Sequence, residues 1–240
     1  MADEKKYFRA IMAASRTALD PTWARAHSEK IQRHVIDSEF YRRCTSVLVY
    51  CAIGNEVGTD LIVDAALASS RTVFFPRIEK SSNTIVAVQV RSRSELRTGA
   101  FGIPEPDSDL PAVSASRLGK CLICVPGLAF SRECHRLGRG GGHYDRFLAG
   151  VGPEAISVGL AYSFQLLDRV PHEERDERLN FIATVSALHR SGDAPLLGGD
   201  TLNEEVHPGD SNFGIPDPGI DNRWRGLVDL WVKPAAEGRR

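Results

Sequence analysis

The sequence predicts an α/β fold in which an open, largely parallel sheet is covered by helices on both faces. Short apolar runs typical of buried strands alternate along the chain with longer segments whose apolar residues recur at helical spacing. The 240 residues, 42% of them hydrophobic, suffice for one such domain with an extension. Ligands bind beyond the carboxyl ends of the strands in sheets of this kind, so a site is expected there.

The N-terminal half is expected to begin with two helices separated by a break at Asp20-Pro21. Thr59 is a plausible N-cap for a later helix, and Pro76 is expected to end a strand. The expected elements, in order, are a helix over 4–19, a helix over 22–38, a strand over 46–51, a helix over 59–68, and strands over 72–75 and 84–90.

The C-terminal half begins with a loop-rich section over 95–118 and then returns to alternating strands and helices. The expected elements are a strand over 121–125, a helix over 142–149, a strand over 156–160, a short helix over 163–169 and a strand over 181–185. Residues 186–240 are rich in Gly, Pro and Asp. We therefore predict a domain over 1–185 and a C-terminal extension of irregular, partly disordered structure over 186–240.

The amino-acid composition and charge of the chain indicate which kinds of binding partner to expect. A net charge of −1 gives no reason to expect nucleic acid or a membrane surface. No apolar run approaches the ~20 residues of a membrane span, and the first residues lack the apolar core of a signal peptide. Five cysteines, an odd number, favour reduced thiols in the cytoplasm. Cys121 and Cys124 lie inside an apolar strand without a second pair, so core packing is favoured over zinc.

A glycine-rich segment follows the apolar run 121–125 and is the main candidate site. Gly138 and Gly140 to Gly142 allow the backbone to approach a ligand closely, and an expected helix follows them. Arg136 and Arg139 could pair with phosphate oxygens, and Asp145 could hold an accompanying Mg²⁺. Neither the Rossmann nor the Walker spacing is present. On the glycines alone, a flexible surface loop is an equal alternative.

Five motifs in order resemble the 5-formyltetrahydrofolate cyclo-ligase family, also called methenyltetrahydrofolate synthetase, over about residues 5–184. Each motif alone is weak, and the order makes the resemblance specific. The motifs are Lys5-Lys6-x-x-Arg9; Asn55-Glu56-Val57 with Thr59; the run 101–106 (FGIPEP); Val125–Phe130 followed by Arg136–Arg146; and Pro171, Glu173 and Asp176 before the last strand.

The resemblance implies a three-layer α/β/α domain and a reaction dependent on ATP and Mg²⁺. That reaction converts 5-formyltetrahydrofolate to 5,10-methenyltetrahydrofolate and releases ADP and phosphate. The formamide oxygen is a poor leaving group, and its phosphorylation would create an imidate phosphate that the neighbouring folate nitrogen can attack. Positioned phosphates and charge neutralisation suit such a transfer. The chain is expected to act on small molecules as a monomer.

The resemblance also assigns roles to residues. ATP contacts are implied for Lys5, Lys6, Arg9, Arg136, Leu137, Gly138, Arg139, Gly140, Gly141, Gly142, His143 and Tyr144. Folate contacts are implied for Cys51, Glu56, Arg139, Gly140, Gly141, Gly142 and His143. Arg139 and Tyr144 are the implied catalytic residues, and Asp145 and Asp176 the implied Mg²⁺ ligands.

Three positions depart from the family pattern. His143 stands where the family usually has Tyr or Phe, Arg175 stands where a His often precedes the second aspartate, and Val185 replaces an acid. The competing hypothesis is a paralogue that binds nucleotide or folate without cyclising it and serves as a regulatory or binding module. Arg136, Arg139, Tyr144 and Asp145 are all present, which favours the enzyme.

Overall fold

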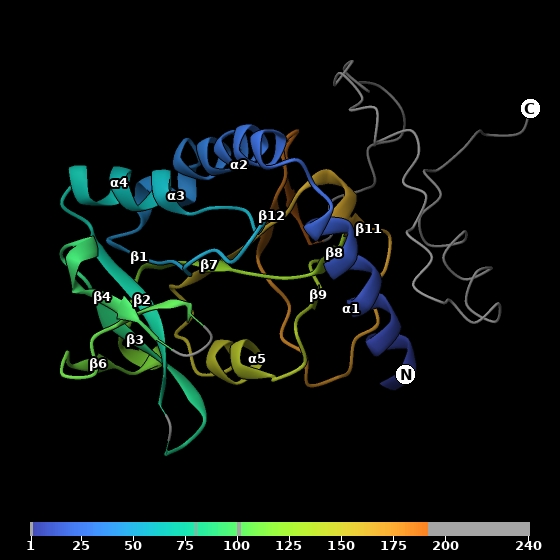
Figure 1. Ribbon diagram of the computed structural model, residues 1–240. Helices are drawn as coiled ribbons and strands as arrows, with labels where there is room; N and C mark the ends of the chain where they lie inside the picture. Colours follow the sequence, from blue (N-terminus) through green and yellow to red (C-terminus); the bar gives the residue numbers. More distant parts are fainter. Residues whose placement is uncertain (1, 80, 100–101, 192–240) are drawn as a thin grey trace, which may run out of the picture.

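A computed structural model describes residues 2–79, 81–99 and 102–191. It shows an eight-stranded sheet between two layers of helices (Figure 1). One face is covered by α2 (Pro21–Ile36), α3 (Glu39–Arg43) and α4 (Asp60–Ala68), and the other by α5 (His143–Leu148). The three-layer α/β/α prediction is confirmed.

The sheet is parallel at its centre and antiparallel at its edges. Its order is β13-β12-β10-β7-β1-β2-β3-β6. The strands from β12 through β2 pair in parallel, whereas β13, β3 and β6 join antiparallel. The bounds are β1 Ser46–Leu48, β2 Thr72–Glu79, β3 Thr84–Gln89, β6 Ala112–Val113, β7 Cys121–Val125, β10 Ile156–Leu160, β12 Phe181–Ala183 and β13 Leu188–Arg190.

Two apolar cores form because successive strand residues face opposite sides of the sheet. On β1, Val47 packs towards α2 and α4, whereas Leu48 packs towards α5. Strand β7 divides in the same way, and Cys121 and Cys124 are buried on its opposite faces. The two thiols therefore serve as core residues.

Helix α1 (Ala2–Thr17) lies beside the main sheet, against a smaller one (Figure 1). That sheet has the order β11-β8-β9, with β8 Ala129–Ser131, β9 Arg136–Leu137 and β11 Leu166–Leu167. Phe8 and Met12 of α1 are buried against it. This packing places the polar face of α1 near the end of β7 and the glycine segment.

Three expected elements differ from the structure. The helix expected over 163–169 is a 3-10 turn, Ser163–Gln165, followed by β11. Gln165 accepts a hydrogen bond from the Tyr162 N–H and donates to the Leu128 carbonyl, which ends the helical pattern. Strand β2 continues through Pro76, because beyond Phe74 it pairs only with β3, and a sheet edge tolerates proline. The strand expected over 46–51 ends at Leu48.

The capping prediction was half right. Thr59 occupies the N-cap position of α4, but its side chain makes no capping hydrogen bond. Its hydroxyl instead donates to the Tyr50 carbonyl at 2.8 Å, which ties the helix to the end of β1.

The predicted boundary at residue 185 falls just before β13, the edge strand of the described sheet. Residues 192–240, and with them most of the predicted extension, lie outside the described residues.

Gly159 on β10 provides a test of the core. A Cβ added there would lie 2.5 Å from Phe130 Cε1 and 2.9 Å from Ile182 Cδ1, and both residues are fully buried. Overpacking of this kind costs about 1–3 kcal/mol. We expect Gly159→Ala to lower the free energy of unfolding by that amount in urea denaturation. Gly152→Ala, where a Cβ meets nothing within 4 Å, should leave it unchanged. Equal stability of the two variants would contradict this packing.

Candidate active site

A cavity of about 470 Å³ opens at the carboxyl ends of the central strands. Its walls come from α1, the residues after β1 and β7, the β2–β3 hairpin and the glycine segment. Every residue predicted to bind ATP, folate or metal lines this cavity except Lys6. Lys6 is exposed on α1, so the structure does not bring it to the other predicted residues.

Arg136 is buried, and one of its guanidinium nitrogens has no hydrogen-bond partner among the described residues. Its side chain is 4% exposed, and Nη2 donates to Asp145 Oδ1 at 2.7 Å. Nη1 is buried and has no hydrogen-bond partner among the described residues, and the same holds for the hydroxyl of Tyr144. An unsatisfied buried donor costs about 1–3 kcal/mol. Both residues line the cavity, so these unsatisfied donors lie next to the space that a ligand would fill.

The chemical state of Tyr144 follows from its surroundings. Burial raises the pKa of the Tyr144 hydroxyl well above its usual value, although the Arg136 guanidinium opposes the shift. That guanidinium lies 5.6 Å from the ring centroid. The hydroxyl therefore keeps its proton at neutral pH and can donate it in a hydrogen bond to a ligand oxygen.

Helix α1 is joined to the cavity by two ionic side chains. Lys5 Nζ donates to Asp176 Oδ2 at 2.8 Å and to Glu173 Oε1 at 3.0 Å. One turn further on, Arg9 Nε donates to the Gly138 carbonyl at 2.9 Å. These bonds hold both the loop that carries Asp176 and the start of the glycine segment.

The pKa values of the Lys5–Asp176 pair shift in opposite directions. Burial lowers the pKa of Lys5, but hydrogen bonds to Asp176 and Glu173 outweigh it, and the pKa is raised overall. Burial raises the pKa of Asp176, but hydrogen bonds from Lys5 and the Glu173 N–H outweigh that effect, and the pKa is lowered overall.

These shifts make the pair's contribution to stability depend on pH. A carboxyl group whose pKa is lowered in the folded state stabilises the fold at pH values above its pKa in the unfolded chain, about 3.9. That stabilisation is lost as the pH falls through the carboxyl pKa of the folded state. A lysine whose pKa is raised in the folded state stabilises the fold at pH values below its pKa in the unfolded chain, about 10.4. That stabilisation is lost as the pH rises through the lysine pKa of the folded state. We expect the Tm difference between wild type and Lys5→Met to peak near neutral pH and to shrink towards about pH 3 and pH 11. A difference independent of pH, followed by circular dichroism, would contradict this pairing.

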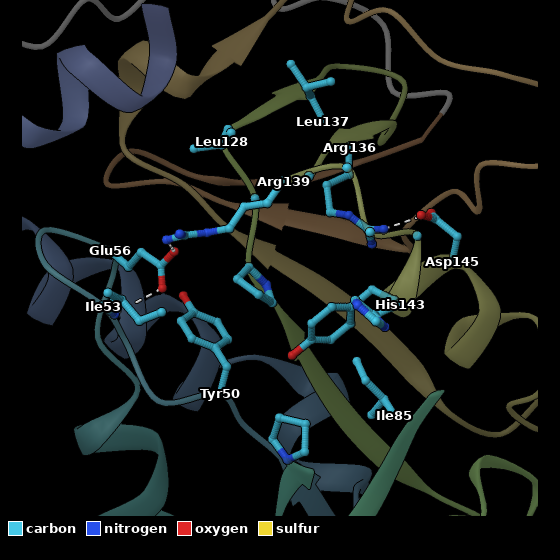
Figure 2. A pocket seen from close by; sticks show the side chains of 18 of the residues that line it. Tyr50, Ile53, Glu56, Ile85, Leu128, Arg136, Leu137, Arg139, His143 and Asp145 are labelled. Carbon is cyan, nitrogen blue, oxygen red and sulfur yellow. Dashed lines mark hydrogen bonds and ion pairs between the residues drawn. The ribbon is translucent and has the colours of Figure 1, made fainter. Parts of the chain in front are cut away.

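Glu56 lies at the other end of the cavity between two arginines. Its Oε1 lies 3.0 Å from Arg139 Nη2 and 3.1 Å from Arg16 Nη2. Its Oε2 accepts the Ile53 N–H at 3.1 Å. Figure 2 shows Arg139 reaching towards Glu56 at one end, while Arg136 and Asp145 lie together at the other. The cavity thus has paired charges at both ends: Glu56 with two arginines at one end, and Arg136 with Asp145 at the other.

The glycine segment bends close to α1. Gly140 has φ +104°, a conformation that favours glycine, and a Cβ there would lie 3.3 Å from Arg9 Cζ. Gly142, with φ +63°, precedes α5. His143 begins that helix, and its Nδ1 lies 3.2 Å from the Asn83 carbonyl between β2 and β3. The imidazole therefore joins the glycine segment to the β2–β3 hairpin.

An apolar surface completes the cavity. It is formed by Ile53, Phe75, Pro76, Ile78, Ile85, Ile103 and Pro104. Figure 2 shows Ile53 and Ile85 on either side of Tyr50. The cavity therefore has a part that contains charged side chains and a part that is apolar. Such a cavity suits two ligands, one anionic and one with flat rings.

The comparisons with known proteins agree along the whole domain. Residues 1–185 match the model of the 5-formyltetrahydrofolate cyclo-ligase family. The chain belongs to this family. A probable 5-formyltetrahydrofolate cyclo-ligase of Schizosaccharomyces pombe is 28% identical over 204 residues, which cover 80% of this chain and 100% of the relative. A mitochondrial 5-formyltetrahydrofolate cyclo-ligase of Arabidopsis thaliana is 27% identical, with 77% of this chain and 75% of the relative covered.

A solved structure supports the same family. The 5,10-methenyltetrahydrofolate synthetase of Aquifex aeolicus is 31% identical and has a TM-score of 0.69, with 83% of this chain and 98% of that chain covered. The predicted resemblance and the prediction of an enzyme of this cyclo-ligase class are thereby confirmed.

The two aspartates fit a metal that arrives with a phosphate. Asp145 and Asp176 both line the cavity. Each already accepts a hydrogen bond from a basic side chain, Asp145 from Arg136 and Asp176 from Lys5. Within the described residues, no group of three or more His, Cys, Asp or Glu could hold a metal ion alone. Mg²⁺ typically takes one or two carboxylates with substrate phosphates and water. The arrangement fits that mode better than a site formed by protein ligands alone.

Sequence reasoning missed Arg16, which is 7% exposed and lines the cavity. Lys5, Arg9 and Arg16 follow one another at intervals of four and seven residues, which places them on one face of α1. That spacing was the available signal. A charged stripe usually faces solvent, and here it faces the site.

Proposed function

We propose that this member of the family cyclises 5-formyltetrahydrofolate to 5,10-methenyltetrahydrofolate in a reaction that depends on ATP and Mg²⁺. The observation that carries the proposal is that Arg136 and Tyr144 line the cavity beside the glycine segment, and that Arg136 Nη1 and the Tyr144 hydroxyl are buried without a hydrogen-bond partner among the described residues. We infer that these donors turn to the oxygens of a phosphate when a nucleotide binds. Glu56, at the opposite end, is placed to accept hydrogen bonds from the donor face of a reduced pterin.

The reaction is proposed to run through a phosphorylated formyl group. The formyl oxygen attacks the γ-phosphorus of ATP, the bond from that phosphorus to the β–γ bridging oxygen breaks, and ADP leaves. The neighbouring folate nitrogen then attacks the formyl carbon and loses its proton. The carbon–oxygen bond breaks, and phosphate departs with the former formyl oxygen. A transfer of this type depends on positioning and charge neutralisation more than on a covalent nucleophile.

The chain's own residues supply those two effects. Arg136 and Arg139 provide positive charge at the cavity, and Tyr144 donates a hydrogen bond to developing oxygen charge. Lys5 and Arg9 fix the loop and the glycine segment against which a nucleotide would rest. Mg²⁺, when bound with the nucleotide at Asp145 and Asp176, would neutralise phosphate charge.

A heavy-oxygen label on the formyl group tests the proposed intermediate. The protein is incubated with ATP, Mg²⁺ and labelled 5-formyltetrahydrofolate, and the released phosphate is analysed by mass spectrometry. We expect one labelled phosphate and one ADP for each methenyl product. Product formation with unlabelled phosphate would overturn the intermediate. Binding of both ligands without either product would favour the non-cyclising paralogue.

The cytoplasmic location and the monomeric state remain predictions. All five cysteines lie in the described part of the chain and are thiols there, which supports a reducing compartment. The Arabidopsis relative is named as mitochondrial. Among the helices of the described residues, none has the length and apolar character needed to cross a membrane.

A further inference from the structure

The carboxylate of Glu56 already has three partners in this structure, which leaves about one acceptor position for a ligand. Oε1 is shared by Arg16 and Arg139, and Oε2 accepts the Ile53 N–H. The Glu56 side chain is 8% exposed, so these partners replace most of its water. A ligand that donates two hydrogen bonds to Glu56 must therefore displace one of them, because a carboxylate offers about four lone-pair positions and three are already used.

The two arginines differ in how firmly they are held. The side chain of Arg16 is 9% exposed, and its Nη1 also donates to the Gly127 carbonyl at 3.3 Å. Asn55, the neighbour of Glu56, donates to the Arg16 carbonyl at 3.2 Å and to the Leu19 carbonyl at 2.9 Å. Arg16, Asn55 and Glu56 therefore form one fixed unit between α1 and the end of β1.

Arg139 is the more exposed partner. Its side chain is 61% exposed, and it lies between Gly138 and Gly140. A backbone flanked by glycines can change conformation at low cost, since no Cβ restricts it. The Arg139–Glu56 pair is also accessible to water, and such pairs contribute little to stability.

We propose that a reduced folate displaces Arg139 from Glu56, whereas Arg16 stays in place as a positioning residue. Arg16 would keep the buried carboxylate paired and oriented while the substrate's N–H donors replace the departing guanidinium. A buried carboxylate left without any counter-charge would be strongly destabilised. The released Arg139 would then be free to pair with phosphate oxygens, so folate binding would prepare the ATP site. This inference rests on the proposed function.

Two matched variants separate the roles of the two arginines. The dissociation constant of 5-formyltetrahydrofolate is measured calorimetrically in the absence of nucleotide for Arg16→Met and Arg139→Met. We expect Arg139→Met to lose much less folate affinity than Arg16→Met, because the substitution also removes a competitor for Glu56. We expect Arg16→Met to bind at least ~10-fold more weakly, because Glu56 then depends on Arg139 for its charge balance. Arg25→Met, which removes an 85% exposed guanidinium from α2, is the control for charge loss.

Turnover kinetics give a second measurement. If Arg16 had only a structural role, its substitution would not change KM for folate selectively. Arg16→Met should raise KM for folate while KM for ATP stays near wild type, and Arg16→Lys should recover part of the loss. In a Glu56→Gln background, Arg16→Met should cause no further loss of folate affinity, since Arg16 acts through that carboxylate. Arg16→Lys keeps the buried charge and carries the test if Arg16→Met does not fold.

The outcomes separate this inference from the proposed function. Equal losses of folate affinity in Arg16→Met and Arg139→Met would overturn the exchange even if the wild type forms methenyl product. A wild type that binds folate but forms no product would overturn the proposed cyclisation, while the ranking of the two variants would still decide the exchange. A wild type that does not bind folate would overturn both.

Discussion

Arg136→Met should lower turnover by at least ~100-fold, equivalent to about 2.7 kcal/mol of transition-state stabilisation. The reason is that Arg136 lines the cavity and that its buried Nη1 has no hydrogen-bond partner among the described residues. Its loss should remove a donor that acts on phosphate oxygens. The measurement is the initial rate of methenyl product formation under saturating substrates, with KM for ATP determined in parallel.

The matched control for this prediction is Arg132→Met. Arg132 lies four residues before Arg136, is 48% exposed, and pairs with Asp168 at 3.3 Å outside the set of cavity residues. It should keep wild-type turnover. If Arg136→Met keeps a turnover within threefold of Arg132→Met, the phosphate-binding role of Arg136 is wrong.

Asp145→Asn should lower turnover by at least ~100-fold, because it keeps the side-chain shape but removes the charge that would meet Mg²⁺ and that now balances Arg136. Breaking the ion pair should also destabilise the fold by ~1–2 kcal/mol, less than a fully buried pair because Asp145 is 22% exposed. The double variant Arg136→Met/Asp145→Asn should recover stability without recovering turnover. Asp168→Asn, on the exposed Arg132–Asp168 pair, is the control.

The dependence of rate on Mg²⁺ distinguishes metal binding from the orientation of Arg136. Asp145→Asn and, more weakly, Asp176→Asn should need more Mg²⁺ for half-maximal rate, and excess Mg²⁺ should partly rescue Asp176→Asn. Wild-type Mg²⁺ dependence in both variants would remove both aspartates from the proposed metal site.

The sheet could be predicted from the sequence because its central strands are short apolar runs separated by helices. The apolar runs of β1 and β7 predicted where these strands lie in the sequence. The alternation of strands with helices predicted that neighbouring strands run parallel. The small sheet of β8, β9 and β11 was missed because its strands have two or three residues, too few to show a period of two. The prediction that the strand ends at Pro76 was wrong, because the sequence does not show which strands lie at an edge, where proline is tolerated.

The candidate site was predicted largely through its motifs, and its geometry was not. The glycine segment, Glu56 and the two aspartates all line one cavity. What the sequence could not show is which charges pair: Lys5 with Asp176, Arg136 with Asp145, and Arg16 with Glu56. These partners lie 171, 9 and 40 positions apart, and only the packing of α1 and β9 brings them together. Val185, where an acid was expected, is buried in the core on the α2 side.

The most direct test of the proposed function is a single assay on the purified wild-type chain. The protein is mixed with ATP, Mg²⁺ and 5-formyltetrahydrofolate, and the absorbance of the methenyl product is followed together with ADP. Cyclisation predicts that product and ADP appear in equal amounts, and that no product forms when ATP is omitted or replaced by a non-hydrolysable analogue. Methenyl product formed equally without ATP, or no product despite binding of both ligands, would contradict it.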